Sequence, residues 1–293
     1  MSARPTVSIG LPVYNGARFL AQALDSLLAQ EYEDFELIIA DNASTDETGQ
    51  IARQYAARDP RIKYDRAEKT RYTQWNFNRV CEMASGEYFM WASCHDLWHR
   101  RFISALVDIM QRDASVVLCF PAASEIDEQD GNLGLLRGGL DTRGLDAPAR
   151  FRKTVRKITG YSIYGLFRAK AVQQVLPAKP SLGPDAMILA EMSFFGAFAF
   201  VNEDLFSLRR MSVSSNWKRY FDHLHLKSTP WNCFRLYGML IGDYLALVRK
   251  YAVGPSQRAS LGAWAVMVLL MRTFLWGLGI IVSKFFPKFY RPF

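Results

Sequence analysis

Residues 7–46 read VSIGLPVYNGARFLAQALDSLLAQEYEDFELIIADNASTD, and this stretch decides the fold. Two apolar runs, at residues 6–11 and 35–40, are rich in side chains typical of β-strands. Between them, residues 17–29 repeat their apolar side chains at helical spacing. The stretch therefore predicts a strand, a helix and a second strand, a succession typical of parallel sheets with covering helices.

The alternation of strands and helices continues beyond this stretch. Residues 44–47 read STDE, a capping-box pattern that predicts a helix from there to Ala57. The Gly- and Arg-rich residues 137–150 are expected to form a mobile loop. Because parallel sheets bind ligands at the carboxyl ends of their strands, functional residues are expected at that edge. Periodicity predicts further strands at residues 62–64, 87–92, 115–120, 161–168 and 198–201, and further helices at 75–84 and 185–195.

Positive charge is concentrated at the C-terminal end of the chain. The whole sequence carries a net charge of +8, but residues 209–293 hold thirteen Lys or Arg and two Asp, a net charge of +11. This end is also rich in Trp, Tyr and Phe, which favours an anionic lipid surface over nucleic acid. Half of all residues are hydrophobic, so a sizeable core is available and disorder of the whole chain is not expected.

Two long helices are predicted near the C-terminus, at residues 231–251 and 257–283, separated by the breaker Gly254-Pro255. The second contains Leu261–Val282, which has Arg272 as its only charge and is long enough to span a bilayer. A central Arg costs about 2.5 to 3.5 kcal/mol on the insertion scale. An interfacial or re-entrant helix, a spanning helix and an ordinary core helix therefore all remain open.

Two observations predict that the chain starts in the cytoplasm. The four cysteines are widely spaced without a Cys-x-x-Cys pair, which favours reduced thiols over a zinc site or a disulfide framework. The apolar stretch near the N-terminus is broken by Gly10 and Pro12 too early for a signal peptide.

Asp41 directly follows the second apolar run and is therefore expected at the carboxyl edge of the sheet. A carboxylate at that edge can accept a hydrogen bond from a nucleotide base or from a ribose hydroxyl. Alternatively, Asp41 and Ser44 only cap the helix that follows.

Motifs in about the first hundred residues resemble the family 2 glycosyltransferases, which have the GT-A fold. The matching stretches are VSIGLPVYNG at residues 7–16, SLLAQ at 26–30, FELIIAD at 35–41, NFN at 76–78, SGEY at 85–88 and DLW at 96–98. Beyond residue 150 the likeness rests on YGLFR at 164–168, GPD at 183–185 and LFSLRR at 205–210.

The resemblance implies an α/β fold, namely a GT-A, Rossmann-like, mainly parallel sheet with flanking helices. Residues 1–229 would form this glycosyltransferase domain, with a nucleotide-binding half over about 1–115 and an acceptor half over about 116–229. Residues 230–293 would form a helical, basic and aromatic segment that associates with a membrane.

The resemblance also implies a nucleotide-sugar site. In that family, the loop matched here by Pro12, Tyr14 and Asn15 packs on the nucleoside, and the acid matched by Asp41 binds the pyrimidine. A uridine or thymidine diphosphate sugar is thereby implied as the donor. Arg71 is expected to contact the base or a phosphate, or else to be a solvated surface residue.

The family's Asp-x-Asp motif, which holds a divalent cation on the donor diphosphate, is altered in this sequence. Ser93 and His95 take the places of the two acids, and the neighbouring Asp96 is the acid that remains. His95 and Asp96 are the predicted ligands of Mn²⁺ or Mg²⁺, with the diphosphate supplying others, and imidazole suits Mn²⁺ better. Alternatively, His95 hydrogen-bonds the diphosphate directly, or has only a structural role.

Inversion at the anomeric carbon requires a base that removes the proton of the acceptor hydroxyl. The family places an Asp for this step at the start of a helix, and Asp185 in the stretch GPDAM matches it. Otherwise Asp185 is an acid favoured by the helix dipole, and Glu191 is a weaker candidate base. Arg209 is expected to balance charge on the leaving group or to face lipid, and Met211 replaces a His that relatives often carry.

The resemblance therefore implies an inverting glycosyltransferase that moves a sugar from a UDP- or dTDP-sugar to a hydroxyl acceptor. The expected acceptor is lipid-linked or part of a cell-surface polysaccharide, and the expected location is the cytoplasmic face of a membrane with anionic lipids. The altered metal motif leaves one rival open, a non-catalytic nucleotide-sugar-binding or scaffold protein. An NAD-dependent oxidoreductase is disfavoured, because no Gly-x-Gly-x-x-Gly follows the first strand.

Overall fold

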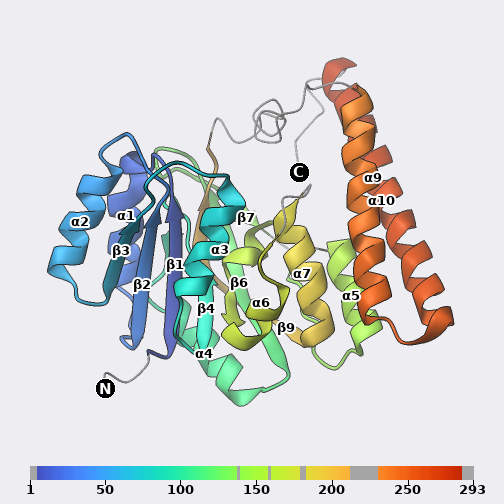
Figure 1. Cartoon of the computed structure of the whole chain (residues 1–293), viewed down its shortest axis with the longest axis horizontal. Helices are drawn as coiled ribbons and strands as arrows, with labels where there is room; N and C mark the ends of the chain where they lie inside the picture. Colours follow the sequence, from blue (N-terminus) through green and yellow to red (C-terminus); the bar gives the residue numbers. More distant parts are fainter. Residues whose placement is uncertain (1–4, 137–138, 158–159, 179–182, 212–229, 286–293) are drawn as a thin grey trace.

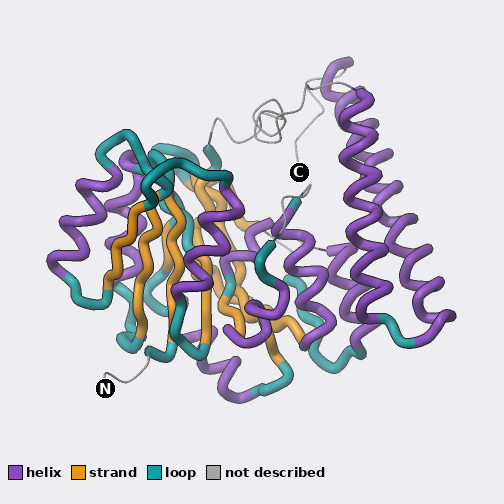
Figure 2. Tube along the Cα trace, in the orientation of Figure 1, coloured by secondary structure: helices purple, strands orange, loops and turns teal. Residues whose placement is uncertain are grey.

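The computed structural model describes residues 5–136, 139–157, 160–178, 183–211 and 230–285 (Figure 1). In the last range, the side chains of residues 230, 231, 233, 234 and 272–285 lie outside the description. Most of the described chain folds around one mixed β-sheet that has helices on both faces, as Figure 2 shows.

The first half of the sheet is parallel and confirms the strands that the sequence predicts. Its strands lie in the order β3-β2-β1-β4, with β1 pairing with both β2 and β4. These strands are β1 (Val7–Val13), β2 (Phe35–Asp41), β3 (Ile62–Arg66) and β4 (Tyr88–Trp91). Every residue of β2 is buried, as expected for a strand covered on both faces.

The second half of the sheet is mixed. From β4 the order continues β8-β6-β9-β5, where β8 is antiparallel to both neighbours and β6 is parallel to β9. The strands are β5 (Leu97–Trp98), β6 (Val116–Ile126), β7 (Asn132–Leu136), which pairs with β6, β8 (Leu166–Arg168) and β9 (Ala197–Arg209). The predicted "mainly parallel" sheet is thus a mixed sheet with a parallel half.

Helices cover the sheet on both faces (Figure 1). The helices that flank the sheet are α1 (Ala17–Leu28), α2 (Thr48–Arg58), α3 (Thr73–Met83), α4 (Phe102–Arg112), α5 (Ala147–Lys157), α6 (Ala169–Val175) and α7 (Pro184–Phe195). Helix α7 begins with Pro184 directly after Gly183, which adopts a positive φ of 74°. Proline at this position fits the first turn of a helix, where its missing N–H costs nothing.

Two predictions for the middle of the chain are wrong. Residues 161–168 are not one strand, because Gly160–Tyr164 forms a 3₁₀ helix, η1, before the short β8. The predicted loop at 137–150 includes the start of α5, and its Leu140 has no exposed surface. Thr142 is also fixed, since its hydroxyl accepts the Phe198 N–H at 2.8 Å and its own N–H bonds back to Phe198.

The two C-terminal helices, α9 (Pro230–Tyr251) and α10 (Gly254–Phe285), form a pair beside the sheet (Figure 1). They share a second apolar core with α5 and α7, which contains Phe151, Ala190, Tyr244 and Leu261 among others. The described first half of α10 is therefore partly a core helix, one of the three roles left open for Leu261–Val282. Cutting the chain at Gly254 would uncover this core, so the helical pair is not an independent tail.

Among the residues whose placement is described, we find no helix that is both long enough and apolar enough to cross a membrane.

Candidate active site

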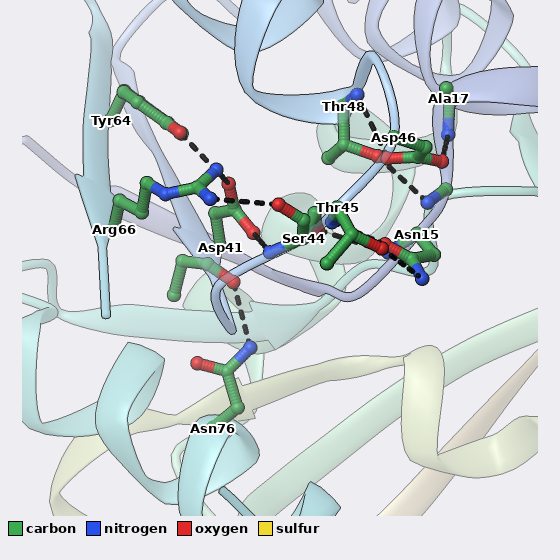
Figure 3. Close-up of polar contacts among 12 residues, drawn as sticks. Asn15, Ala17, Asp41, Ser44, Thr45, Asp46, Thr48, Tyr64, Arg66 and Asn76 are labelled. Carbon is green, nitrogen blue, oxygen red and sulfur yellow. Dashed lines mark hydrogen bonds and ion pairs between the residues drawn. The ribbon is translucent and has the colours of Figure 1, made fainter. Parts of the chain in front are cut away.

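Two loops meet at the carboxyl edge of the parallel strands, after β1 and after β2 (Figure 3). The Asn15 N–H donates to Ser44 Oγ at 3.0 Å, and the Thr45 N–H donates to Asn15 Oδ1 at 2.8 Å. Asn15 has a φ of 50°, in the left-handed region that Asn tolerates better than most residues. These bonds fix the loop of Asn15, predicted to bind the nucleoside, against the loop that follows Asp41.

Asp46 joins the same loops to the first turns of two helices. Its carboxylate accepts the Ala17 N–H at 3.1 Å and the Thr48 N–H at 3.0 Å. Burial opposes its ionisation, yet the bonds from Thr48 and Ala17 hold the pKa of Asp46 below its ordinary value. The capping-box prediction is wrong in its register, because α2 begins at Thr48 and Asp46 supports the start of both α1 and α2.

Asp41 lies at the end of β2, as predicted, but it has no exposed surface. Its carboxylate accepts the Ser44 N–H at 2.7 Å, the Tyr64 hydroxyl at 2.9 Å and an Arg66 guanidinium N–H at 2.8 Å (Figure 3). A base therefore cannot touch this carboxylate in the present structure. The geometry gives Asp41 a positioning role, in which it holds Arg66 and the Ser44 loop at the site.

Exposed side chains surround this anchored centre. Tyr14 is 47% exposed, and Asn15 and Arg71 are exposed as well, whereas Pro12 is half-buried. The side-chain amide of Asn42 holds the Arg71 backbone from both sides, at 2.8 and 3.0 Å. The Arg71 guanidinium lies 4.5 Å from the centre of the Trp75 ring, a cation–π contact that orients it.

The segment of the altered metal motif is held by Arg209, the last residue of β9. Asp96 is buried, and its Oδ1 accepts the Arg209 backbone N–H at 2.8 Å. Its Oδ2 has no partner at hydrogen-bonding distance among the described residues. Burial raises the pKa of Asp96 to about 7, although the Arg209 N–H and the nearby Ser93 hydroxyl favour the charged form.

The Arg209 side chain is buried and fully engaged by protein groups. Its guanidinium donates to the carbonyl oxygens of His95 and Asp127 and to Gln22 Oε1, at 2.7 to 2.9 Å. It also forms an ion pair with Asp130 at 2.6 Å, and its own side chain has no exposed surface. This differs from the predicted role, since a guanidinium held in this way does not reach a leaving group.

The predicted metal ligands fit a divalent cation poorly. Described residues contain no group of three or more His, Cys, Asp or Glu side chains placed to hold a metal ion. His95 Nε2 lies 4.0 Å from Asp96 Oδ1, but only the imidazole is partly exposed. Burial and the Arg209 charge lower the pKa of His95 to about 4, so the imidazole is neutral at pH 7.

Asp185 occupies the predicted place in the first turn of α7. Its side chain is accessible to solvent, yet it lines a pocket of about 190 Å³ and is closely surrounded by protein. Burial in this setting raises the pKa of Asp185 to about 6. Burial, together with the charges of Asp96 and Asp185, raises the pKa of the Tyr164 phenol well above its ordinary value.

Glu191, the weaker candidate base, is occupied elsewhere on α7. Its Oε1 accepts hydrogen bonds from Lys250 Nζ at 2.9 Å and from the Tyr251 hydroxyl at 2.7 Å. Both partners belong to α9, so Glu191 joins the C-terminal helices to the sheet domain.

Comparison with known proteins settles the family. The profile described as glycosyl transferase family 2 matches residues 8–175, which is more than half of the chain. The chain belongs to glycosyl transferase family 2. The matched region carries the loops of Asn15 and Asp41 and the altered metal motif, and it ends before Asp185.

Curated relatives agree with the assignment of a glycosyltransferase. An uncharacterized glycosyltransferase of Rickettsia typhi is 34% identical over 130 residues, 44% of this chain and 40% of that protein. The glycosyltransferase GlyG of Streptococcus pneumoniae is 28% identical over 136 residues, 46% of this chain and 44% of that protein. The chain thus spans less than half the length of these curated relatives.

A solved structure supports the GT-A fold beyond the matched region. The crystal structure of Staphylococcus aureus TarS in complex with UDP-GlcNAc superposes with a TM-score of 0.68 at 12% identity. The superposed residues cover 89% of this chain and 71% of the TarS chain. At this identity the likeness shows the fold alone, and it confirms the α/β architecture with flanking helices.

Sequence reasoning missed several residues that build the site. Tyr64, Arg66, Asn42 and Asn76 hold the ends of β2 and its loop, and Asn76 Nδ2 donates to the Ala40 carbonyl at 2.7 Å. One signal was available, because Asp41 and Arg66 pair in the register of β2 and β3. Opposite charges on adjacent strands in that register predict an ion pair.

Proposed function

We propose that this family 2 glycosyltransferase moves a sugar, with inversion, from a uridine or thymidine diphosphate sugar to a hydroxyl acceptor. The observation that carries the proposal is the placement of Asp185. Its accessible carboxyl, with a pKa raised to about 6, lines a pocket that also contains residues of α3 and β4. A base with a pKa just below neutral is ionised at pH 7 and still accepts a proton readily.

The donor nucleoside would lie over the joined loops after β1 and β2. Tyr14 offers an exposed ring for stacking, Asn15 is held by Ser44 and Thr45, and Arg71 presents an oriented positive charge. The family resemblance favours a pyrimidine base here, and the TarS structure of the same fold contains UDP-GlcNAc. We therefore infer a UDP- or dTDP-sugar.

In the proposed reaction, Asp185 takes the proton of the acceptor hydroxyl as that oxygen attacks the anomeric carbon. The attack comes from the side opposite the diphosphate, so the bond from the anomeric carbon to the diphosphate oxygen breaks and the configuration inverts. The electron pair of that bond leaves with the nucleoside diphosphate. The proton rests on Asp185 until solvent removes it.

Replacing Asp41 tests the nucleoside site. We expect Asp41→Ala to weaken binding of uridine or thymidine diphosphate tenfold or more, because Arg66 and the Ser44 loop lose charge-assisted bonds worth roughly 1.5 kcal/mol or more. Asp59→Ala is the matched control, since Asp59 is also ion-paired but lies after the C-terminal end of α2. Titration calorimetry measures both, and unchanged affinity in Asp41→Ala would refute the assignment.

The divalent cation expected from the sequence stays a prediction. If His95 is its ligand, His95→Asp restores a family acid, and activity is expected to depend more strongly on Mg²⁺ than in the natural protein. Activity is measured against Mg²⁺ and Mn²⁺ in both proteins, with melting temperature as the control for folding. An unchanged metal response together with a lower melting temperature would show that His95 is a packing residue.

Membrane association is also a proposal, and the exposed face of α10 supports it. Met267, Leu270 and Met271 are 49%, 55% and 56% exposed on a helix of the basic C-terminal region. An apolar surface on a helix of a region that is basic in sequence favours attachment to anionic lipid. We infer that the protein meets a lipid-linked or polysaccharide acceptor at the cytoplasmic face of a membrane.

Charge substitutions on this face test the attachment. Leu270→Glu with Met271→Glu is expected to weaken binding to phosphatidylserine vesicles roughly tenfold or more, because apolar area is lost and charge repulsion is added. The control is Gln54→Glu with Ala57→Glu on the exposed side of α2, which adds the same charge. Equal vesicle binding by the two double variants, measured by co-sedimentation, contradicts attachment through α10.

The rival is a non-catalytic nucleotide-sugar-binding protein, and the altered motif at Ser93 and His95 favours it. Slow hydrolysis of the donor by water, in the absence of an acceptor, distinguishes an enzyme from such a binding protein, because it releases nucleoside diphosphate. An enzyme releases it and loses the release in Asp185→Asn, whereas a scaffold binds the donor and releases nothing.

A further inference from the structure

The pocket beside Asp185 has an apolar interior that the proposed reaction does not use. It lies where α3, β4, η1 and α7 meet, and its volume is about 190 Å³. Pockets for drug-sized ligands usually measure about 300 to 1,000 Å³, so this one is too small for a nucleotide. Its apolar walls are Phe77, Trp91, Ile163, Ala178, Pro184 and Ile188.

Two polar side chains of the wall are already satisfied by the protein. The Asn78 amide donates to the Ala178 carbonyl at 3.2 Å and accepts the Ala178 N–H at 2.9 Å. Trp91 Nε1 donates to the Phe77 carbonyl at 3.1 Å. These groups therefore offer little to a sugar hydroxyl placed deep in the pocket.

Other polar groups of the pocket remain available. The carboxyl of Asp185 and the amide of Gln74 have no hydrogen-bond partner within the described part of the chain, and both line the same pocket. A ligand with hydroxyl groups toward Asp185 and an apolar group toward Trp91 and Ile188 would match this arrangement. A hydroxyl facing the apolar wall would instead lose its hydrogen bonds to water.

The surrounding elements indicate which part of the substrate occupies the pocket. Helix α3 begins at Thr73, two residues after Arg71, and Thr73 and Gln74 line the pocket. Trp91 ends β4, the strand that leads to His95. The pocket thus contains the proposed base and shares α3 and β4 with the segments that carry Arg71 and His95, so the sugar of the donor is expected to reach it.

We propose that this pocket receives an apolar substituent of the donor sugar, so that the protein selects an acetamido or a 6-deoxy sugar over the plain hexose. The proposal rests on the proposed function, because it assumes a nucleotide-sugar donor. It names the substrate class through one feature, a terminal methyl group, which an acetamido sugar carries on its N-acetyl group and a 6-deoxy sugar carries at C6. One methylene group in an apolar pocket discriminates roughly 10- to 200-fold.

The test compares donors that differ only in this group. UDP-N-acetylglucosamine is compared with UDP-glucose, and dTDP-6-deoxyglucose with dTDP-glucose, by calorimetry on the full chain. At least one donor with a methyl group is expected to bind ten times or more tightly than its plain partner. Ala178→Phe fills the pocket and is expected to reduce that preference below threefold while affinity for UDP and dTDP stays unchanged.

Ala57→Phe, at an exposed position of α2, is the matched control and is expected to keep the preference. The proposal is overturned if natural protein binds all donors equally, or if Ala178→Phe keeps the preference. It is also overturned if the methyl preference appears only among acceptor sugars in a transfer assay. Failure of the proposed function looks different, since then none of these nucleotide sugars or nucleotides binds.

Should Ala178→Phe fail to fold, Ile188→Asn supplies the second variant. A polar amide on the same wall is expected to lower the preference for the methyl-bearing donor toward parity. A preference that persists in a folded Ile188→Asn protein counts against the pocket as strongly as one that persists in Ala178→Phe.

Discussion

Asp185→Asn is expected to lower the rate of sugar transfer by about two orders of magnitude or more, as removal of a general base does. Donor affinity should change little, because the carboxamide has nearly the same shape and its oxygen still accepts a hydrogen bond from a sugar hydroxyl. The measurement is the steady-state transfer rate together with calorimetric affinity for the donor. A rate near that of the natural protein would place the base elsewhere.

The matched control for this variant is on the same helix. Glu191→Gln also replaces an acid by its amide, but Glu191 is bonded to Lys250 and Tyr251 rather than facing the pocket. We expect transfer within a few-fold of the natural rate. A large loss in Glu191→Gln, with Asp185→Asn active, would reverse the assignment.

The pH dependence gives a second readout of the same base. Asp185 must be ionised to accept a proton, and the protein around it in the pocket raises its pKa to about 6. Therefore kcat/KM should be level above pH 7 and fall roughly tenfold per pH unit well below pH 6. This acid limb should be missing from the residual activity of Asp185→Asn.

Arg209→Met is expected to be the most destabilising single substitution in the site, costing about 3 to 5 kcal/mol of unfolding free energy. The buried guanidinium contacts His95, Asp127, Gln22 and Asp130, and its loss leaves buried carbonyl groups without donors. Urea denaturation measures the change. If Arg209→Met instead lowers the affinity for nucleotide and leaves the free energy of unfolding unchanged, that result would support the role in donor binding predicted from the sequence.

The neighbouring residue supplies the control. Arg210 forms an ion pair with Glu125, but its side chain is 54% exposed. Arg210→Met removes the same charge and is expected to cost less than about 1 kcal/mol, as exposed ion pairs do. Equal destabilisation by the two variants would show that burial of Arg209 is not the cause.

Local patterns in the sequence predicted the first half of the fold well. The strands at β1 to β4 and the helices between them follow from apolar periodicity in short segments, because each element shows its own period within a few residues. Asp41 was placed at the correct edge of the sheet for the same reason, since it directly ends a strand. Asp185 was found differently, because the family resemblance rather than a local pattern placed it at the start of a helix.

Contacts between distant segments could not be predicted in this way. The Arg209 backbone N–H donates to Asp96, 113 residues earlier in the sequence, and no local pattern predicts that hydrogen bond. The strand β8 lies between β4 and β6 and is antiparallel to both. It has only three residues, which are too few for a hydrophobic pattern to predict its partners or direction. The core shared by α5, α7, α9 and α10 was hidden because an apolar helix that packs on protein resembles one that faces lipid.

The central claim is that this chain transfers a sugar from a pyrimidine nucleotide donor using Asp185. The most direct measurement is release of nucleoside diphosphate from UDP-, dTDP- and GDP-sugars, by the natural protein and by Asp185→Asn, with hydroxyl acceptors supplied. The account predicts release from a UDP- or dTDP-sugar that falls about a hundredfold or more in Asp185→Asn while the donor still binds. Equal release by the two proteins, or release from GDP-sugars alone, would contradict it.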